Sequence, residues 1–192
     1  MKILTAKKIS IAFKSSLLAS CLLLGLTATS VSSEVKFGFM IGYTGDMGAW
    51  APALDDAAKV AVEEINKDGG VLGNKVSLSI ADNQSNVEGA IKGAKKLVEV
   101  DGVSLIIGPE SDPIMALLQY AKDTKVPVIT SSAGTQALDE AGGTGTFIYR
   151  ANAADSFLGV AYAKVILETL GHKNIVVLAE NTEGTMSAAE TF

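Results

Sequence analysis

The sequence is poor in the side chains that most often carry out chemistry at neutral pH. It holds one cysteine, Cys21, and one histidine, His172. If the segment containing Cys21 is removed, disulfides, thiolate catalysis and cysteine metal sites are all excluded. A single histidine cannot form a catalytic constellation alone. We therefore expect no catalytic residues, no metal and no cofactor.

Long apolar runs are also scarce, and the clearest one lies near the N-terminus. Leu17 to Leu26 is apolar but shorter than the roughly 20 residues needed to span a bilayer. No acidic residue precedes Glu34, and small polar residues fill Thr27 to Ser33. Lysines precede the run: Lys2, Lys7, Lys8 and Lys14. This order predicts a signal peptide over residues 1–33, cleaved after Ser33, and hence a periplasmic or extracytoplasmic protein.

An alternative interpretation places a lipid-attachment motif at Leu18-Ala19-Ser20-Cys21. Cys21 would then be lipidated and would tether the protein to the membrane surface. The apolar run continues past this cysteine through Leu22 to Leu24, which favours simple cleavage. The mass of the exported protein distinguishes the two hypotheses.

Positive charge is limited once the leader is removed. Its four lysines leave 12 of the 16 Lys and Arg residues, against 21 Asp and Glu, so the mature net charge is −9. An acidic surface repels nucleic acid and anionic lipid, and neither is expected as a partner. The 159 residues after the leader suffice for one domain and a remainder.

The remaining pattern alternates short apolar runs with longer segments of helical period, which predicts an α/β fold with a doubly wound parallel sheet and helices on both faces. The expected strands are 35–41, 75–82, 103–107, 126–130, 147–150 and 175–179. The expected helices run from Pro52 to Asn66, from a capping box at Ser85 and Glu88 to Val100, over 112–124, briefly after a Thr135 cap, over 153–170, and up to Phe192. The first of these helices has a mostly apolar stripe: Ala57, Val60, Ala61, Glu64 and Ile65.

In such a sheet, ligands bind beyond the carboxyl ends of the strands. Four loops share that edge: 42–51, 83–86, 108–112 and 131–135. Their hydroxyls and glycines suit a small polar ligand, one that bears a carboxylate. The hydroxyls are those of Ser111, Ser131, Ser132 and Thr135.

Several motifs in this order resemble the branched-chain amino-acid (Leu/Ile/Val) binding proteins of ABC transport, also called type I periplasmic binding proteins. They are Gly45-Asp46-Met47-Gly48, Glu63-Glu64-Ile65-Asn66, Gly69-Gly70-Val71-Leu72-Gly73, Ile106-Ile107-Gly108-Pro109 and Val126-Pro127-Val128-Ile129. The resemblance implies two lobes that close on a ligand by hinge motion, no catalysis, a membrane permease as partner and a monomer. It implies a first lobe over 34–150, with the hinge and the beginning of a second lobe over 151–192 that continues beyond Phe192.

The resemblance also implies a set of ligand-binding residues. The family's aromatic pocket residue falls on Trp50, and a hydroxyl for the ligand carboxylate falls on Ser111. The loop that holds the carboxylate and ammonium groups falls on Ser132, Ala133, Gly134 and Thr135. Gly134 replaces the usual threonine, although Thr135 could supply the hydroxyl one residue later, and Gly184 stands where the family has a further aromatic residue. These departures suggest a ligand other than a branched-chain amino acid. The resemblance leaves other amino acids, amides, urea and aromatic acids open.

Two other functions stay open. A sensor domain with the same lobes would regulate a fused kinase or channel. A dinucleotide-dependent enzyme would use Gly38, Gly42 and Gly45 with Asp82 as the ribose-binding acid, but these glycines do not follow the G-x-G-x-x-G spacing.

Overall fold

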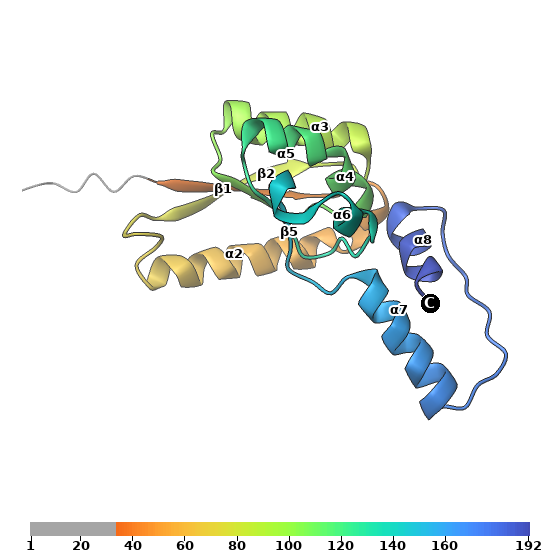
Figure 1. Cartoon of the computed structure of the whole chain (residues 1–192). Helices are drawn as coiled ribbons and strands as arrows, with labels where there is room; N and C mark the ends of the chain where they lie inside the picture. The colour runs from red at the N-terminus through yellow and green to blue at the C-terminus, as the bar shows by residue number, and fades with distance from the viewer. Residues whose placement is uncertain (1–33) are drawn as a thin grey trace, which may run out of the picture. The chain divides into compact units, whose positions relative to one another are not determined.

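The computed structural model describes residues 34–192 (Figure 1). The predicted signal peptide and the alternative lipid site at Cys21 lie outside the described residues. Strands β1 to β5 form one parallel sheet in the order β2-β1-β3-β4-β5. Their bounds are Val35–Ile41, Val76–Asp82, Leu105–Ile107, Val128–Thr130 and Ile148–Arg150. The chain adds β2 on one side of β1 and then β3, β4 and β5 on the other side. The point where the winding direction reverses, the topological switch point, therefore lies between β1 and β3.

Helices cover both faces of the sheet, as the sequence predicts. The helix α2 lies on one face, and α3, α4 and α5 lie on the other (Figure 1). The helices are α2 Ala51–Lys67, α3 Val87–Lys95, α4 Ser111–Ala116, α5 Leu118–Thr124, α6 Ala137–Glu140, α7 Asp155–Lys164 and α8 Glu183–Glu190. Short helical turns complete the chain: η1 Asp46–Ala49, η2 Lys96–Val100, η3 Gly143–Thr146 and η4 Val165–Thr169. None of the helices within residues 34–192 has the length and apolar character to cross a membrane.

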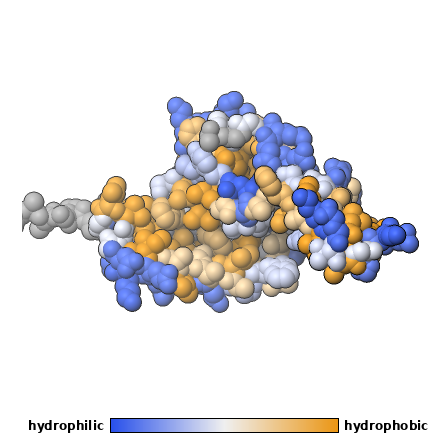
Figure 2. All heavy atoms as spheres, turned by 60° about the horizontal axis from the view of Figure 1, so that its bottom comes forward, coloured by the Kyte–Doolittle hydropathy of each residue, from blue (hydrophilic) through white to orange (hydrophobic). Residues whose placement is uncertain are grey.

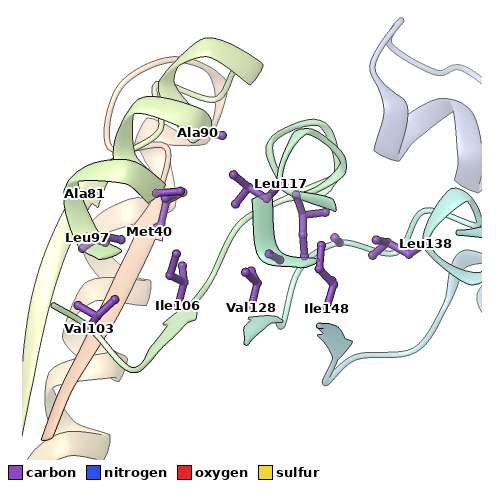
Figure 3. Packing of buried hydrophobic residues seen from close by; sticks show 14 residues of the cluster. Met40, Ala81, Ala90, Leu97, Val103, Ile106, Leu117, Val128, Leu138 and Ile148 are labelled. Atoms are coloured by element: carbon purple, nitrogen blue, oxygen red, sulfur yellow. The ribbon is translucent and has the colours of Figure 1, made fainter. Parts of the chain in front are cut away.

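The larger core lies between the sheet and α3, α4 and α5 (Figure 3). Met40 and Ile106 from neighbouring strands meet Leu97 and Leu117 from the helices, and all four side chains are fully or almost fully buried. A smaller cluster around Phe39 and the other strand residues facing α2 fills the opposite side of the sheet. The two clusters anchor the strand ends from which the rim loops depart.

Most residues of the stripe expected on α2 do not face the sheet, so this prediction is wrong. Val60 is exposed, and so are Ala57, Ala61 and Glu64. Leu54 and Ala58 pack on the sheet instead, with Ala51 at the start of the helix fully buried. Both sets repeat with a helical period, so the sequence pattern alone could not choose between them.

The helix cap before α3 also differs from the prediction. Asn86, rather than Ser85, is the N-cap, because its side chain accepts a hydrogen bond from the Gly89 amide at 2.8 Å. Ser85 has a left-handed backbone with φ of 52° and turns its hydroxyl toward the first rim loop. The predicted helix over 112–124 is divided into α4 and α5 at Leu117.

The strand expected at residues 175–179 does not form. Val176 and Leu178 are 85% and 93% exposed, and no described segment pairs with this stretch. An apolar run becomes a strand only where a neighbouring strand accepts its backbone hydrogen bonds.

Candidate functional site

A cavity of about 700 Å³ lies at the carboxyl edge of the sheet. Three of the four rim loops meet on one side of it around Ser85, Glu110 and Ser111, and the fourth contributes Ser132 and Gly134. Residues 180–185, which lie after the predicted hinge, complete the lining, and the Glu183 amide donates to the Asp112 carboxylate at 3.2 Å. The lining residues are Asp46, Met47, Trp50, Ser85, Glu110, Ser111, Asp112, Pro113, Ser132, Gly134, Asp155, Glu180, Thr182, Gly184 and Thr185.

The first rim loop is held by the Asp82 carboxylate at the end of β2. Asp82 accepts hydrogen bonds from the Tyr43 amide at 2.9 Å, the Thr44 hydroxyl at 2.7 Å and the Gln84 amide at 2.8 Å. Burial raises the pKa of Asp82, but these hydrogen bonds outweigh it and the pKa lies below its ordinary value. Both carboxylate oxygens are thus occupied by loop donors, which leaves Asp82 poorly suited to hold a ribose.

Ser85 connects this first loop to the second. Its hydroxyl donates to the Thr44 carbonyl and accepts from the Met47 amide, both at 3.1 Å. The contact fixes the short turn that leads to Trp50, which precedes α2. Trp50 is 66% exposed and lines the cavity, so its indole is free to cover a ligand.

Asn83 and Glu110 connect the second loop to the third. Asn83 is fully buried, donates to Glu110 Oε2 at 2.9 Å and accepts from the Ser85 amide at 2.8 Å. The other carboxyl oxygen, Glu110 Oε1, is buried without a hydrogen-bond partner. Desolvation by burial raises the pKa of Glu110, and the negative charges of Asp112 and Asp82 act in the same direction.

This shift predicts how Glu110→Gln changes stability with pH. The folded protein holds the Glu110 proton at pH values where the unfolded chain has lost it, so the contribution is complete below the ordinary pKa and is lost as pH rises through the raised value. Gln removes that loss and keeps an acceptor for Asn83. We therefore compare the melting temperatures of the variant and wild type by circular dichroism at pH 4 and pH 7. The difference, variant minus wild type, should be larger at pH 7 than at pH 4. The exposed Glu63→Gln is the control, and an equal difference at both pH values would contradict the prediction.

The fourth loop depends on the hydroxyl of Thr130, at the end of β4. This fully buried group donates to the Pro109 carbonyl at 2.7 Å and accepts from the Ala133 amide at 2.8 Å and the Ser132 amide at 3.2 Å. The arrangement presents Ser132 to the cavity beside Ser111, which begins α4.

Gly134 and Asp155 form the side of the site nearest the predicted hinge. The Asp155 amide donates to the Gly134 carbonyl at 2.8 Å. A side chain on Gly134 would overlap the Asp155 carboxylate, so the glycine leaves room for this acid. Asp155 is the first residue of α7, where a negative charge is favoured by the helix dipole.

The structure brings together four of the six predicted ligand-binding residues. Trp50, Ser111, Ser132 and Gly134 line the cavity. Ala133 and Thr135 are fully buried and do not line it. The Thr135 hydroxyl instead donates to Glu183 at 2.6 Å, which ties this loop to α8.

Sequence reasoning missed Asn83, Glu110 and Asp155. The cavity-facing carboxylates could have been suspected only from their positions, since Glu110 follows the Gly108-Pro109 break and Asp155 begins a helix. Within residues 34–192, no group of three or more His, Cys, Asp and Glu side chains is placed to hold a metal ion. The cavity is polar, and the charged residues that line it are Asp and Glu.

Curated relatives of the chain carry amino-acid-binding names. The chain is 27% identical over 177 residues to the Leu/Ile/Val-binding protein BraC3 of Rhizobium johnstonii, which covers 87% of this chain and 47% of the relative. It is 26% identical over 168 residues to the Leu/Ile/Val-binding protein of Escherichia coli strain K12, with coverage of 87% and 45%. The chain thus spans a little under half the length of these relatives.

Solved structures similar to this chain carry related names. The branched-chain amino acid transporter substrate-binding protein of Streptococcus pneumoniae, solved with isoleucine, has a TM-score of 0.75 and 28% identity over 83% of this chain and 45% of that one. A leucine-binding protein of Thermotoga maritima has a TM-score of 0.72 and 26% identity, over 82% and 44%. The sequence profile of the family described as periplasmic binding protein matches residues 34–192, and the chain belongs to that family.

Proposed function

We propose that this chain is the N-terminal part of an extracytoplasmic solute-binding protein of an ABC importer. Its ligand is a small polar molecule such as an amino acid or a related carboxylate or amide, held without turnover. The observation that carries the proposal is the cavity at the carboxyl edge of the sheet, which is lined both by the rim loops and by residues 180–185 from beyond the predicted hinge. The relatives named above bind branched-chain amino acids by name, which supports the same class of ligand.

The proposal assigns residues 34–150 to a first lobe and residues 151–192 to the hinge and the beginning of a second. The segment after Asn152 exposes many large apolar side chains, and Figure 2 shows apolar surface at the right of the view, where α7 lies. The most exposed are Phe157, Val160, Tyr162, Leu170, Val176 and Leu178. Surfaces of this kind mark contacts with other protein elements, and here the remaining elements of the second lobe would cover them.

The proposal also includes export by the leader at residues 1–33, docking of the closed monomer on a membrane permease, and soluble release in preference to a lipid tether at Cys21. The leader's basic residues and short apolar run support export. Family membership supports an extracytoplasmic location.

Trp50→Ala tests the ligand contact. A panel of amino acids, amides, urea and aromatic acids is first screened by thermal shift on the full-length exported protein, and each hit is recovered to check that it is chemically unchanged. Calorimetry of the best hit should then show about thirtyfold weaker binding by Trp50→Ala, a loss of about 2 kcal/mol for an aromatic anchor.

Two variants serve as controls for this measurement. Trp50→Phe keeps an aromatic face and should bind within a few-fold of wild type. Leu72→Ala removes an exposed side chain that does not line the cavity and should change nothing. Unchanged affinity in Trp50→Ala contradicts the proposed contact, and consumption of every hit contradicts the proposed function.

A further inference from the structure

The helix α8 is attached to the rim of the cavity, although it lies well beyond the predicted hinge along the chain. Its first residue, Glu183, makes two contacts there. The Glu183 amide donates to the Asp112 carboxylate at 3.2 Å, and the Glu183 carboxylate accepts from the Thr135 hydroxyl at 2.6 Å. One turn later, the buried Ser187 hydroxyl accepts from the Gln136 amide at 3.0 Å. The helix thus contacts two separate rim loops, one at α4 and one just before α6 (Figure 1).

The contact with Asp112 is an addition to the cap that α8 already has. Thr182 is the N-cap, and its hydroxyl accepts from the Thr185 amide. The first N–H groups of a helix have no partner within the helix, and the helix dipole favours negative charge at this end. Asp112 therefore caps α8 from another part of the chain, and its charge strengthens the contact.

Gly184 lies where the first turn of α8 meets α4. A Cβ atom at this position would lie 3.1 Å from Ser111 Oγ and 3.5 Å from Ser111 Cβ, and the first of these distances is closer than side chains usually pack. The glycine therefore lets the first turn of α8 approach the rim closely.

Close packing also joins α8 to α7, the first helix after the hinge. A side chain on Gly159 of α7 would overlap the Thr191 carbonyl, so the two backbones lie against each other. The Thr191 hydroxyl donates to the Asp155 carbonyl at 3.0 Å, at the start of α7. Because α7 follows the hinge directly, a contact that holds α8 also restricts the rotation of α7 about the hinge.

We propose that α8 is a latch: Asp112 and Thr135 hold it against the rim of the empty cavity, so that the hinge closes before any ligand is bound. The inference rests on the two-lobed arrangement of the proposed function. It adds that the closed arrangement is populated in the empty protein and that these two side chains set its population. A change that lowers this population lowers the apparent affinity for a ligand of the closed state by the same factor.

Spin-label distances in the empty full-length protein test the latch. Residues 34–192 contain no cysteine, so labels are introduced at two exposed positions, on α2 and beyond α7, by Glu63→Cys and Lys173→Cys. Any other cysteine of the protein is changed to serine, and bound solute is removed by dialysis in denaturant followed by refolding. Pulsed electron paramagnetic resonance should show one component at the distance given by the structure, for the closed hinge, beside longer distances for the open hinge.

Variants at the two latch residues should shift the ratio of the closed to the open component. Asp112→Asn keeps the size of the acceptor and removes its charge, so the ratio should fall about fivefold, which is the difference between a charge-assisted and a neutral hydrogen bond. Thr135→Val removes the hydroxyl and should lower the ratio by a similar factor. Two controls should leave the ratio at the wild-type value: Thr135→Ser keeps the hydroxyl, and Asp56→Asn changes an exposed carboxylate on α2.

Two results would overturn the latch. One is the absence of the closed component from the empty wild-type protein, and the other is an unchanged ratio in Asp112→Asn, which decides the case if Thr135→Val does not fold. Because no ligand is added, these distances are independent of the solute screen. A screen without hits contradicts the proposed function, whereas an unchanged ratio beside a positive screen contradicts the latch alone.

Discussion

Thr130→Val is expected to lower the free energy of unfolding by about 3 kcal/mol and to remove most ligand binding. The fully buried Thr130 hydroxyl satisfies the Pro109 carbonyl and the amides of Ala133 and Ser132. Valine has nearly the same shape but no hydroxyl, so these backbone groups would be buried without partners. The loop that presents Ser132 would lose the stronger of its two side-chain hydrogen bonds to the third rim loop, since only the contact of the Ser132 hydroxyl with the Gly108 carbonyl at 3.4 Å would remain.

The measurement is denaturant unfolding of the full-length protein, combined with calorimetry of the best ligand. Thr130→Ser is the matched control, since it keeps the oxygen and loses one methyl group, at a cost of about 1 kcal/mol. If valine were as stable as serine at this position, the hydroxyl would not hold the loop.

Gly89→Ala should lower the free energy of unfolding by about 3 kcal/mol, although the same substitution usually stabilises a helix by up to about 1 kcal/mol. Gly89 lies in the first turn of α3 and is buried. A side chain there would overlap the Asn83 carbonyl, which is backbone and cannot rotate away. The displacement should also weaken ligand binding, because Asn83 orients Glu110.

Thermal unfolding with and without ligand measures both effects. Gly145→Ala is the control, since a side chain at that glycine meets no neighbouring atom. A variant at position 89 that is more stable than wild type would show that α3 moves away from the sheet edge easily, contrary to the close contact described above.

Much of the fold could be predicted from the sequence because its signals are local. Pro52 near the start of α2, the glycines after it and the apolar runs of β1 and β2 each determine an element from a few neighbouring residues. The parallel direction of the strands followed from the alternation of those elements, whereas the order of the strands in the sheet came only from the structure. Where two local patterns competed, as in the stripe on α2, the sequence could not decide, and packing on the sheet did.

The strand expected at residues 175–179 shows a second limit of prediction from local sequence. Its apolar composition is a local property, but a strand is stable only when another strand lies beside it. Val176 and Leu178 have no such neighbour in the described part of the chain and remain exposed. Here the apolar composition alone was uninformative about strand pairing.

The sequence by itself determined the acidic composition, the α/β alternation, the resemblance to binding proteins and the edge of the sheet where a ligand would bind. Only the tertiary structure decided which residues line that edge. It buried Ala133 and Thr135, joined Asn83 to Glu110 across 27 positions, and set Gly134 against Asp155. The physical reason is that helices and strands arise from interactions between neighbours in the chain, whereas a binding site is made by contacts between loops that are distant in it.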